Sequence, residues 1–182
     1  MIADSIRLNR VSLFVKLAED LKVEDIPAGV ISYVGSFSKS QLGQDMFALI
    51  ISDFKSDGFF VEFGATDGIG LSNSYLLEKK YGWNGILAEP AVHWHKKLAQ
   101  NRDVSISNLA VYNTSGQSVA FRETQDPEIS TISSFSDGDK HSKARSNYRE
   151  YRVSTISLED LLVSHGAPRV IDFLSMDTEG SE

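Results

Sequence analysis

The stretch FFVEFGATDGIG (residues 59–70) decides the fold, because it is typical of a buried strand that runs into a glycine turn. Residues 59–63 are aromatic or β-branched apart from Glu62, a composition that favours an extended strand. Gly64, Gly68 and Gly70 complete the pattern acidic-x-Gly-x-x-x-Gly-x-Gly, and glycines let a backbone approach a ligand closely. A strand followed by such a turn predicts a site for a nucleoside cofactor.

Strands and helices are expected to alternate through the middle of the chain. Alternation of this kind predicts a parallel sheet with helices on both faces, and therefore an α/β fold. The predicted strands are residues 59–63, 85–89, 104–109 and 170–176, and the predicted helices are about residues 72–81, 91–100 and 157–164.

Two further helices are predicted before the glycine turn. Apolar residues recur at helical spacing over residues 5–21. Ser38, with Gln41 at the third position after it, predicts a capping box for a second helix, and proline and glycines interrupt the pattern over residues 27–35. The expected organisation is an N-terminal helical cap (residues 1–37) and a cofactor-binding domain (residues 38–182).

The alternation breaks after residue 109. Residues 119–122 and 151–155 predict two shorter strands, and the polar loop between them, residues 123–150, shows no clear apolar period. Loops of this length are often functional lids or disordered. Basic residues with interleaved tyrosines lie between Lys140 and Arg152, and they are either a solvated face or a patch that receives an anionic substrate or partner.

Composition indicates a globular protein without disulfides. The chain has 182 residues, of which 41% are hydrophobic, and this is enough to bury one core. It contains no cysteine and therefore no disulfide. Its apolar runs are shorter than the roughly 18 residues of a membrane helix, and no signal segment opens it, so we expect a cytoplasmic protein without a membrane partner. The net charge of −7 disfavours a nucleic acid partner.

The glycine turn fits S-adenosylmethionine better than a dinucleotide. A dinucleotide fingerprint needs Gly-x-Gly-x-x-Gly directly after the strand, but Ala65 and Thr66 follow Gly64, so the second glycine is missing. This absence disfavours an NAD-dependent oxidoreductase. S-adenosylmethionine carries an ammonium and a sulfonium in place of a pyrophosphate, so an acid at Glu62 is electrostatically suitable.

Two residues at the ends of later strands support a nucleoside site. Glu89 follows the turn by about 20 residues, where an acid can accept the ribose hydroxyl hydrogens; the alternative is a plain surface acid before Pro90. Asn108 ends the third strand and can both donate to and accept from an adenine edge, or it is a simple turn residue.

Four ordered motifs resemble the FkbM family of methyltransferases. They are SQLGQD (residues 40–45), FFVEFGATDGIGLSNSYLLEKKYGWNGILAEP (59–90), STISSF (130–135) and IDFLSMDTEGSE (171–182). Members of this family are similar to class I methyltransferases with a Rossmann-like sheet, and the characterised ones methylate hydroxyls of sugars or natural products. The residues expected to bind the cofactor are Glu62, Gly64, Ala65, Asp67, Gly68, Glu89 and Asn108.

Three residues are candidates for the general base. Asp177 follows the carboxyl end of a predicted strand, where open α/β sheets place their ligands, and the resemblance implies a place beside the cofactor for Asp177 and Glu179. The alternative for this pair is helix capping. His141, in the long loop, is the other candidate, because histidine titrates near neutrality. No metal site is predicted.

The expected function is S-adenosylmethionine-dependent methyl transfer to a hydroxyl of a sugar, glycan or natural product. A complete domain of this family would continue past DTEGSE, so we expect a sheet truncated after its fourth core strand and a chain that is weakly active or inactive alone. Residues 171–176 would then form an edge strand open to self-association. The alternative is a non-catalytic binding or regulatory module derived from a methyltransferase.

Overall fold

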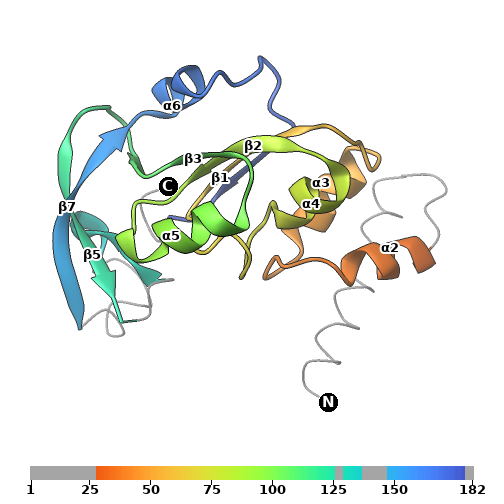
Figure 1. Ribbon diagram of the computed structural model, residues 1–182, viewed down its shortest axis with the longest axis horizontal. Helices are drawn as coiled ribbons and strands as arrows, with labels where there is room; N and C mark the ends of the chain where they lie inside the picture. Colours follow the sequence, from red (N-terminus) through yellow and green to blue (C-terminus); the bar gives the residue numbers. More distant parts are fainter. Residues whose placement is uncertain (1–27, 126–128, 137–146, 179–182) are drawn as a thin grey trace.

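The computed structural model describes residues 28–125, 129–136 and 147–178, and this part of the chain is a mixed α/β protein (Figure 1). The α/β class predicted from the sequence is therefore confirmed. Its strands form two separate sheets of four strands each. The helix predicted over residues 5–21 lies outside the described residues. Within them, no helix is long and apolar enough to cross a membrane.

The first sheet is parallel and has the strand order β3-β2-β1-β8. The chain builds it outward from the centre to one side and then returns to the other side of β1. Open α/β sheets bind ligands where the strand order reverses, which in this sheet is at the carboxyl end of β1. The complete Rossmann-like topology stays a prediction. The strands are β1 (Phe59–Phe63), β2 (Asn84–Ala88), β3 (Ser105–Ser107) and β8 (Phe173–Met176).

Helices cover both faces of this sheet, because its strands are apolar on both sides. Phe60 and Leu87 are fully buried against α2, α3, α4 and α5, whereas Val61 and Ile86 pack on the opposite side against α6. Burying each such side chain contributes about 1.5 to 3 kcal/mol. The helices are α2 (Ala28–Gly35), α3 (Gln44–Ile51), α4 (Tyr75–Tyr81), α5 (Val92–Asn101) and α6 (Leu158–Ser164).

The second sheet has the order β4-β7-β5-β6 and packs on α5 through Trp94, Phe121 and Ile132. Its two long strands were predicted, but both are longer than expected, so the predicted loop over residues 123–150 is wrong at both ends. A short strand and the 3₁₀ helix η2 (Ser133–Phe135) also lie within that range. The strands are β4 (Ala110–Val111), β5 (Ser118–Thr124), β6 (Thr131–Ile132) and β7 (Tyr148–Ile156).

Two predictions about the segment before the glycine turn are wrong. The capping box is absent, since α3 begins after Gly43 and the Ser38 hydroxyl instead donates to the Asp45 carboxylate at 2.7 Å. Helix α2 was not predicted, because Gly29 and its neighbours suggested a break. Ile31 is buried in the core, and this packing outweighs the cost of a helical glycine, about 1 kcal/mol. The domain division after residue 37 stays a prediction.

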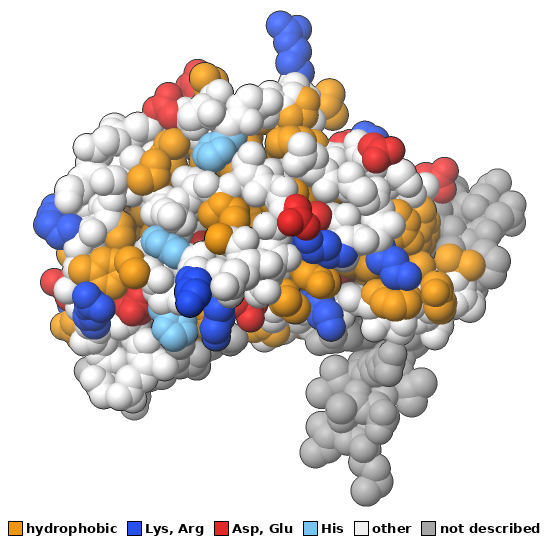
Figure 2. Space-filling model, viewed as in Figure 1, with side chains coloured by type: hydrophobic (Ala, Val, Ile, Leu, Met, Phe, Trp, Pro, Cys, Tyr) orange, Lys and Arg blue, Asp and Glu red, His pale blue; other side chains and the backbone are white. Residues whose placement is uncertain are grey.

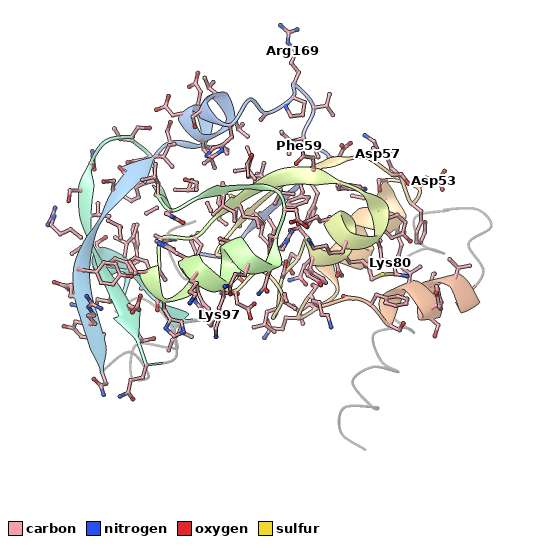
Figure 3. All side chains as sticks on the ribbon, viewed as in Figure 1. Asp53, Asp57, Phe59, Lys80, Lys97 and Arg169 are labelled. Carbon is pink, nitrogen blue, oxygen red and sulfur yellow. The ribbon has the colours of Figure 1, made fainter. Side chains whose placement is uncertain are left out.

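The connection into β1 is a second tight turn. Asp53, Phe54 and Asp57 all have positive φ, and Figure 3 shows Asp57 between Asp53 and Phe59, the first residue of β1. The backbone N–H of Asp57 donates to the carbonyl of Tyr81 at 3.0 Å. The chain before the amino end of β1 is therefore fixed by a backbone hydrogen bond to the last residue of α4. The glycine turn lies at the carboxyl end of β1.

Candidate functional site

The parallel register brings four of the predicted site residues to one edge of the first sheet. Phe63 of β1 is paired with Ala88 of β2 and with Met176 of β8, and Ala88 is paired with Ser107 of β3. The residues that directly follow these positions therefore lie at the same level of the sheet. They are Gly64, Glu89, Asp177 and Asn108, of which Asp177 and Asn108 are exposed.

Gly64, at the end of β1, lies against the backbone of the segment that follows β8. It has a φ of +72°, and a Cβ built on it would lie 1.9 Å from the carbonyl oxygen of Asp177. Only a residue without a side chain fits between the ends of β1 and β8. The glycine thus allows the Asp177 segment to pack directly on the turn.

The turn after Gly64 has an unusual backbone that polar contacts hold in place. Thr66 and Leu71 have positive φ although they are not glycines, a state that costs about 1 to 3 kcal/mol each and is typical of functional sites. One carboxylate oxygen of Asp67 accepts the N–H groups of Ile69 and Gly70, both at 2.8 Å. Asp67 therefore stabilises the turn itself, and its contact with a cofactor stays a prediction, as does that of the fully buried Ala65.

Glu89 lies beside the turn with its carboxylate already oriented. Oε2 accepts a hydrogen bond from the N–H of Thr66 at 2.9 Å, and Oε1 accepts one from the N–H of Ala91 at 2.8 Å. A carboxylate has about four acceptor positions, so these two donors do not saturate it. Burial raises the pKa of Glu89 to about 7, and the nearby charge of Glu123 adds to this effect.

The second sheet holds the start of α5 next to Glu89. The hydroxyl of Tyr151 donates to the Glu123 carboxylate at 2.7 Å and accepts the N–H of Val92 at 3.0 Å. The same carboxylate accepts the N–H of His93 at 3.2 Å. These contacts were not predicted, since Glu123 and Tyr151 are far apart in sequence and only the pairing of Phe121 with Tyr151 brings them together.

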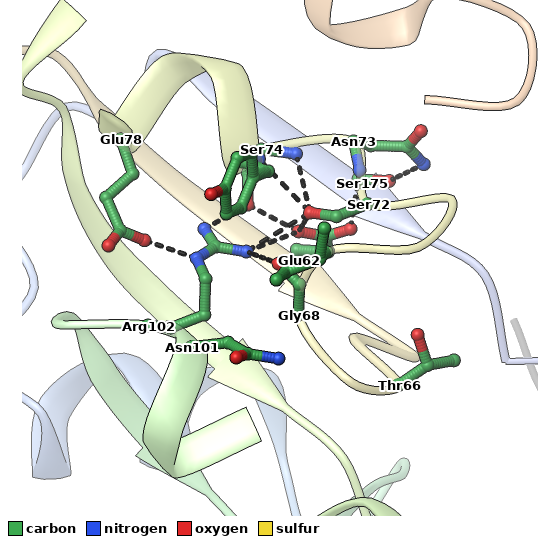
Figure 4. A network of polar contacts seen from close by, with 12 residues as sticks. Glu62, Thr66, Gly68, Ser72, Asn73, Ser74, Glu78, Asn101, Arg102 and Ser175 are labelled. Atoms are coloured by element: carbon green, nitrogen blue, oxygen red, sulfur yellow. Dashed lines mark hydrogen bonds and ion pairs between the residues drawn. The ribbon is translucent and has the colours of Figure 1, made fainter. Parts of the chain in front are cut away.

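Glu62 is the buried centre of a polar network on the α4 side of β1 (Figure 4). Its Oε1 accepts the N–H of Asn73 at 2.8 Å, and its Oε2 accepts the hydroxyls of Ser72, at 3.1 Å, and Ser74. Only 3% of the residue is exposed, and burial raises its pKa. In the structure Glu62 therefore joins β1 to the segment that leads into α4, while direct contact with a cofactor stays a prediction.

The motifs that lie far apart in sequence converge on this edge. Ser40, from SQLGQD, donates to the Asn73 side chain at 2.8 Å, and Asn73 in turn donates to Ser175 of β8 at 2.9 Å. Thr131, from STISSF, donates to the carbonyl of Thr178 at 3.4 Å. The first motif therefore contacts the segment between the glycine turn and α4, and the third contacts the segment that follows β8.

Three other predicted features have different outcomes. His141 and Glu179 lie outside the described residues, so their roles stay predictions. The basic patch is described only at its end, where Arg149 and Arg152 lie on opposite faces of β7. Arg149 extends over the Tyr151 ring, 5.7 Å from its centre, and Arg152 donates to the Ser118 hydroxyl at 2.7 Å.

Comparison with known proteins gives one match. A family model described as the methyltransferase FkbM domain matches residues 62–182. No curated protein and no solved structure matches the chain. The matched span begins at Glu62 and contains Gly64, Glu89 and Asp177, the residues that the sheet brings to one edge.

Proposed function

The chain belongs to the FkbM methyltransferase family, and from this premise we propose that it transfers a methyl group from S-adenosylmethionine to a hydroxyl of a sugar, glycan or natural product. The observation that carries the proposal is the contact between Glu89 and Thr66. It fixes an acidic acceptor beside a strained glycine turn, at the reversal point of a parallel sheet.

The residues present fit this cofactor. Gly64 lets the segment that follows β8 pack on the glycine turn, which keeps Asp177 close to the turn that would hold the cofactor. Glu89 has acceptor positions left for the two ribose hydroxyls, and the exposed Asn108 follows β3 at the same level for the adenine. When bound, S-adenosylmethionine supplies a methyl group activated by its positively charged sulfur.

The work left to the protein is mainly alignment. Reactants held in a productive geometry gain effective molarities of about 10⁵ to 10⁸ M, whereas a general base contributes about 10²- to 10⁴-fold. The glycine turn and Glu89 would orient the donor, and the segment after β8 would orient the acceptor hydroxyl. Asp177 is exposed at this edge and is our first candidate to accept the hydroxyl proton, with Glu179 and His141 as alternatives.

The experiment that tests this function uses S-adenosylmethionine with a labelled methyl group. The chain is incubated with a panel of sugars, oligosaccharides and hydroxylated natural products, and label in each acceptor is counted. Transfer to an acceptor that depends on Glu89 supports the proposal. Binding of the cofactor without transfer to any acceptor favours the non-catalytic module.

A further inference from the structure

Two residues at the carboxyl end of α5 donate hydrogen bonds to the backbone of the glycine turn. The side-chain amide of Asn101 donates to the carbonyl of Asp67 at 2.8 Å. The guanidinium of Arg102 donates to the carbonyl of Gly68 at 3.0 Å (Figure 4). The aliphatic part of Arg102 also packs on the turn, since a Cβ on Gly68 would lie 2.6 Å from Arg102 Cγ. The turn is therefore shaped by residues about 30 positions later in the sequence.

The side chain of Arg102 is completely buried, and its guanidinium makes polar contacts with several residues. Nη1 donates to Ser72 Oγ at 3.1 Å, Nη2 donates to Ser74 Oγ at 2.9 Å, and Nε pairs with Glu78. Its side chain has an exposed fraction of 0%. A lysine could supply the charge but not this fixed fork of donors.

The link between Arg102 and Glu62 runs through two serines. The guanidinium lies 4.0 Å from the Glu62 carboxylate, whereas Ser72 and Ser74 each accept from Arg102 and donate to Glu62. Arg102 therefore has two separable effects. It compensates a buried negative charge, and it fixes the carbonyl of Gly68.

Helix α5 thus reaches both halves of the candidate site. Ala91, directly before the helix, donates to Glu89, and Arg102, directly after it, donates to the turn. Figure 1 shows α5 running alongside the parallel sheet. Lysine and histidine side chains lie on the surface over α5 (Figure 2), whereas Trp94 and Leu98 of this helix are buried. A rigid helix with one buried face is a suitable frame for a site that must keep a fixed geometry.

We propose that Arg102 is a positioning residue for the S-adenosylmethionine site. Its hydrogen bond to Gly68 orients the turn whose Thr66 contacts Glu89, so loss of that bond weakens cofactor binding even when the buried charge is compensated in another way. This inference rests on the proposed function. The competing explanation is that Arg102 serves only to neutralise Glu62, because its other acidic partner, Glu78, is also paired with Lys79 at 2.6 Å.

The two explanations differ in a double variant. In Arg102→Met the buried carboxylate of Glu62 loses its partner, and in Arg102→Met with Glu62→Gln both charges are removed. We compare these with Glu62→Gln alone, with Arg102→Lys, and with Arg152→Lys as a control at an exposed arginine of the second sheet. Denaturant unfolding, calorimetric titration with S-adenosylmethionine, and hydrogen exchange without ligand are measured for each.

The double variant should regain stability relative to Arg102→Met but not affinity. We expect the double variant to bind S-adenosylmethionine about tenfold to a hundredfold more weakly than Glu62→Gln. We expect the same loss for Arg102→Lys relative to wild type, because an effect of this size corresponds to one or two charge-assisted hydrogen bonds. The control should bind like wild type. If the double variant binds as tightly as Glu62→Gln alone, Arg102 only neutralises charge and the inference is overturned.

Hydrogen exchange separates this inference from the proposed function. Amides of residues 64–72 should exchange faster in Arg102→Lys and in the double variant, while amides of β1 and β2 stay protected. This readout needs no ligand. Wild type that binds no S-adenosylmethionine contradicts the proposed function, whereas unchanged exchange in the turn contradicts the role of Arg102.

Discussion

The carbonyl oxygen of Asp177 occupies the space that a side chain on Gly64 would need, 1.9 Å from the position of its Cβ. Gly64 begins the glycine turn and Asp177 begins the segment that follows β8. The contact therefore joins the two parts of the candidate site that lie farthest apart in the sequence. Both the fold and the candidate site therefore depend on the absence of a side chain at Gly64.

Gly64→Ala should destabilise the protein more than an alanine at another glycine with the same backbone. Gly116 has a φ of +76° and open space around it, so Gly116→Ala measures the cost of positive φ alone, about 1 to 2 kcal/mol. Gly64→Ala adds a clash with Asp177. Denaturant unfolding of both variants checks this. Equal losses of stability would show that Asp177 does not press on Gly64.

Glu89→Gln should change how stability depends on pH. Burial raises the pKa of Glu89 from 4.5 to about 7, so the folded state binds more protons than the unfolded state between these values. The contribution of this group to stability is fully present below about pH 4.5 and is lost as the pH rises through 7. Glutamine cannot ionise, so the variant should show a flatter profile across this window.

The free energy of unfolding of wild type and of Glu89→Gln, measured from pH 4.5 to 8, gives the slope of stability against pH for each protein. Glu159→Gln, at an exposed acid of α6, is the control and should keep the wild-type slope. Asp45, whose pKa burial raises to about 6, accounts for part of the slope that remains. Parallel profiles for wild type and Glu89→Gln would contradict the assignment of this titration to Glu89.

Tyr151→Phe should weaken the attachment of the second sheet to α5. The substitution removes the hydroxyl that accepts from Val92 and donates to Glu123, and hydrogen bonds of these two kinds contribute about 0.5 to 3 kcal/mol. Tyr148→Phe, at an exposed position of the same strand, should cost much less. Equal unfolding free energies for the two variants would remove the proposed role of the Tyr151 hydroxyl.

Asp177→Asn should lower turnover while leaving cofactor binding nearly intact. If Asp177 accepts the hydroxyl proton, its loss reduces kcat by about 10²- to 10⁴-fold. Kinetics with the acceptor found in the labelled-methyl assay, together with the Kd for S-adenosylmethionine, separate catalysis from binding. If Asp177→Asn turned over at the wild-type rate, Asp177 would not be the general base, and Glu179 and His141 would be the candidates that are left.

Much of the first sheet could be predicted because its signals are local. The apolar strand at β1, the glycines after it and the helix patterns of α4 and α5 depend on residues close together in the sequence. The positions of Glu89 and Asp177 followed from the rule that parallel strands end at one edge. The register, with Phe63 opposite both Ala88 and Met176, agrees with that reasoning.

The contacts that support the site could not be predicted in the same way. Arg102 follows a helix end, where a basic residue ordinarily suggests only a favourable interaction with the helix dipole. Its partners Gly68 and Glu62 are identified only when α5 is packed against the turn. Tyr151 and Glu123 likewise meet through strand pairing, and a sequence motif carries no signal for either contact.

The measurement that tests the central claim most directly is a calorimetric titration of wild type and Glu89→Ala with S-adenosylmethionine. It should be made at pH 8, where the carboxylate of Glu89 is ionised, because its pKa is about 7. We expect saturable binding at one site in wild type, weakened at least about tenfold in Glu89→Ala by loss of the ribose acceptor. No heat from wild type at millimolar ligand would contradict the account.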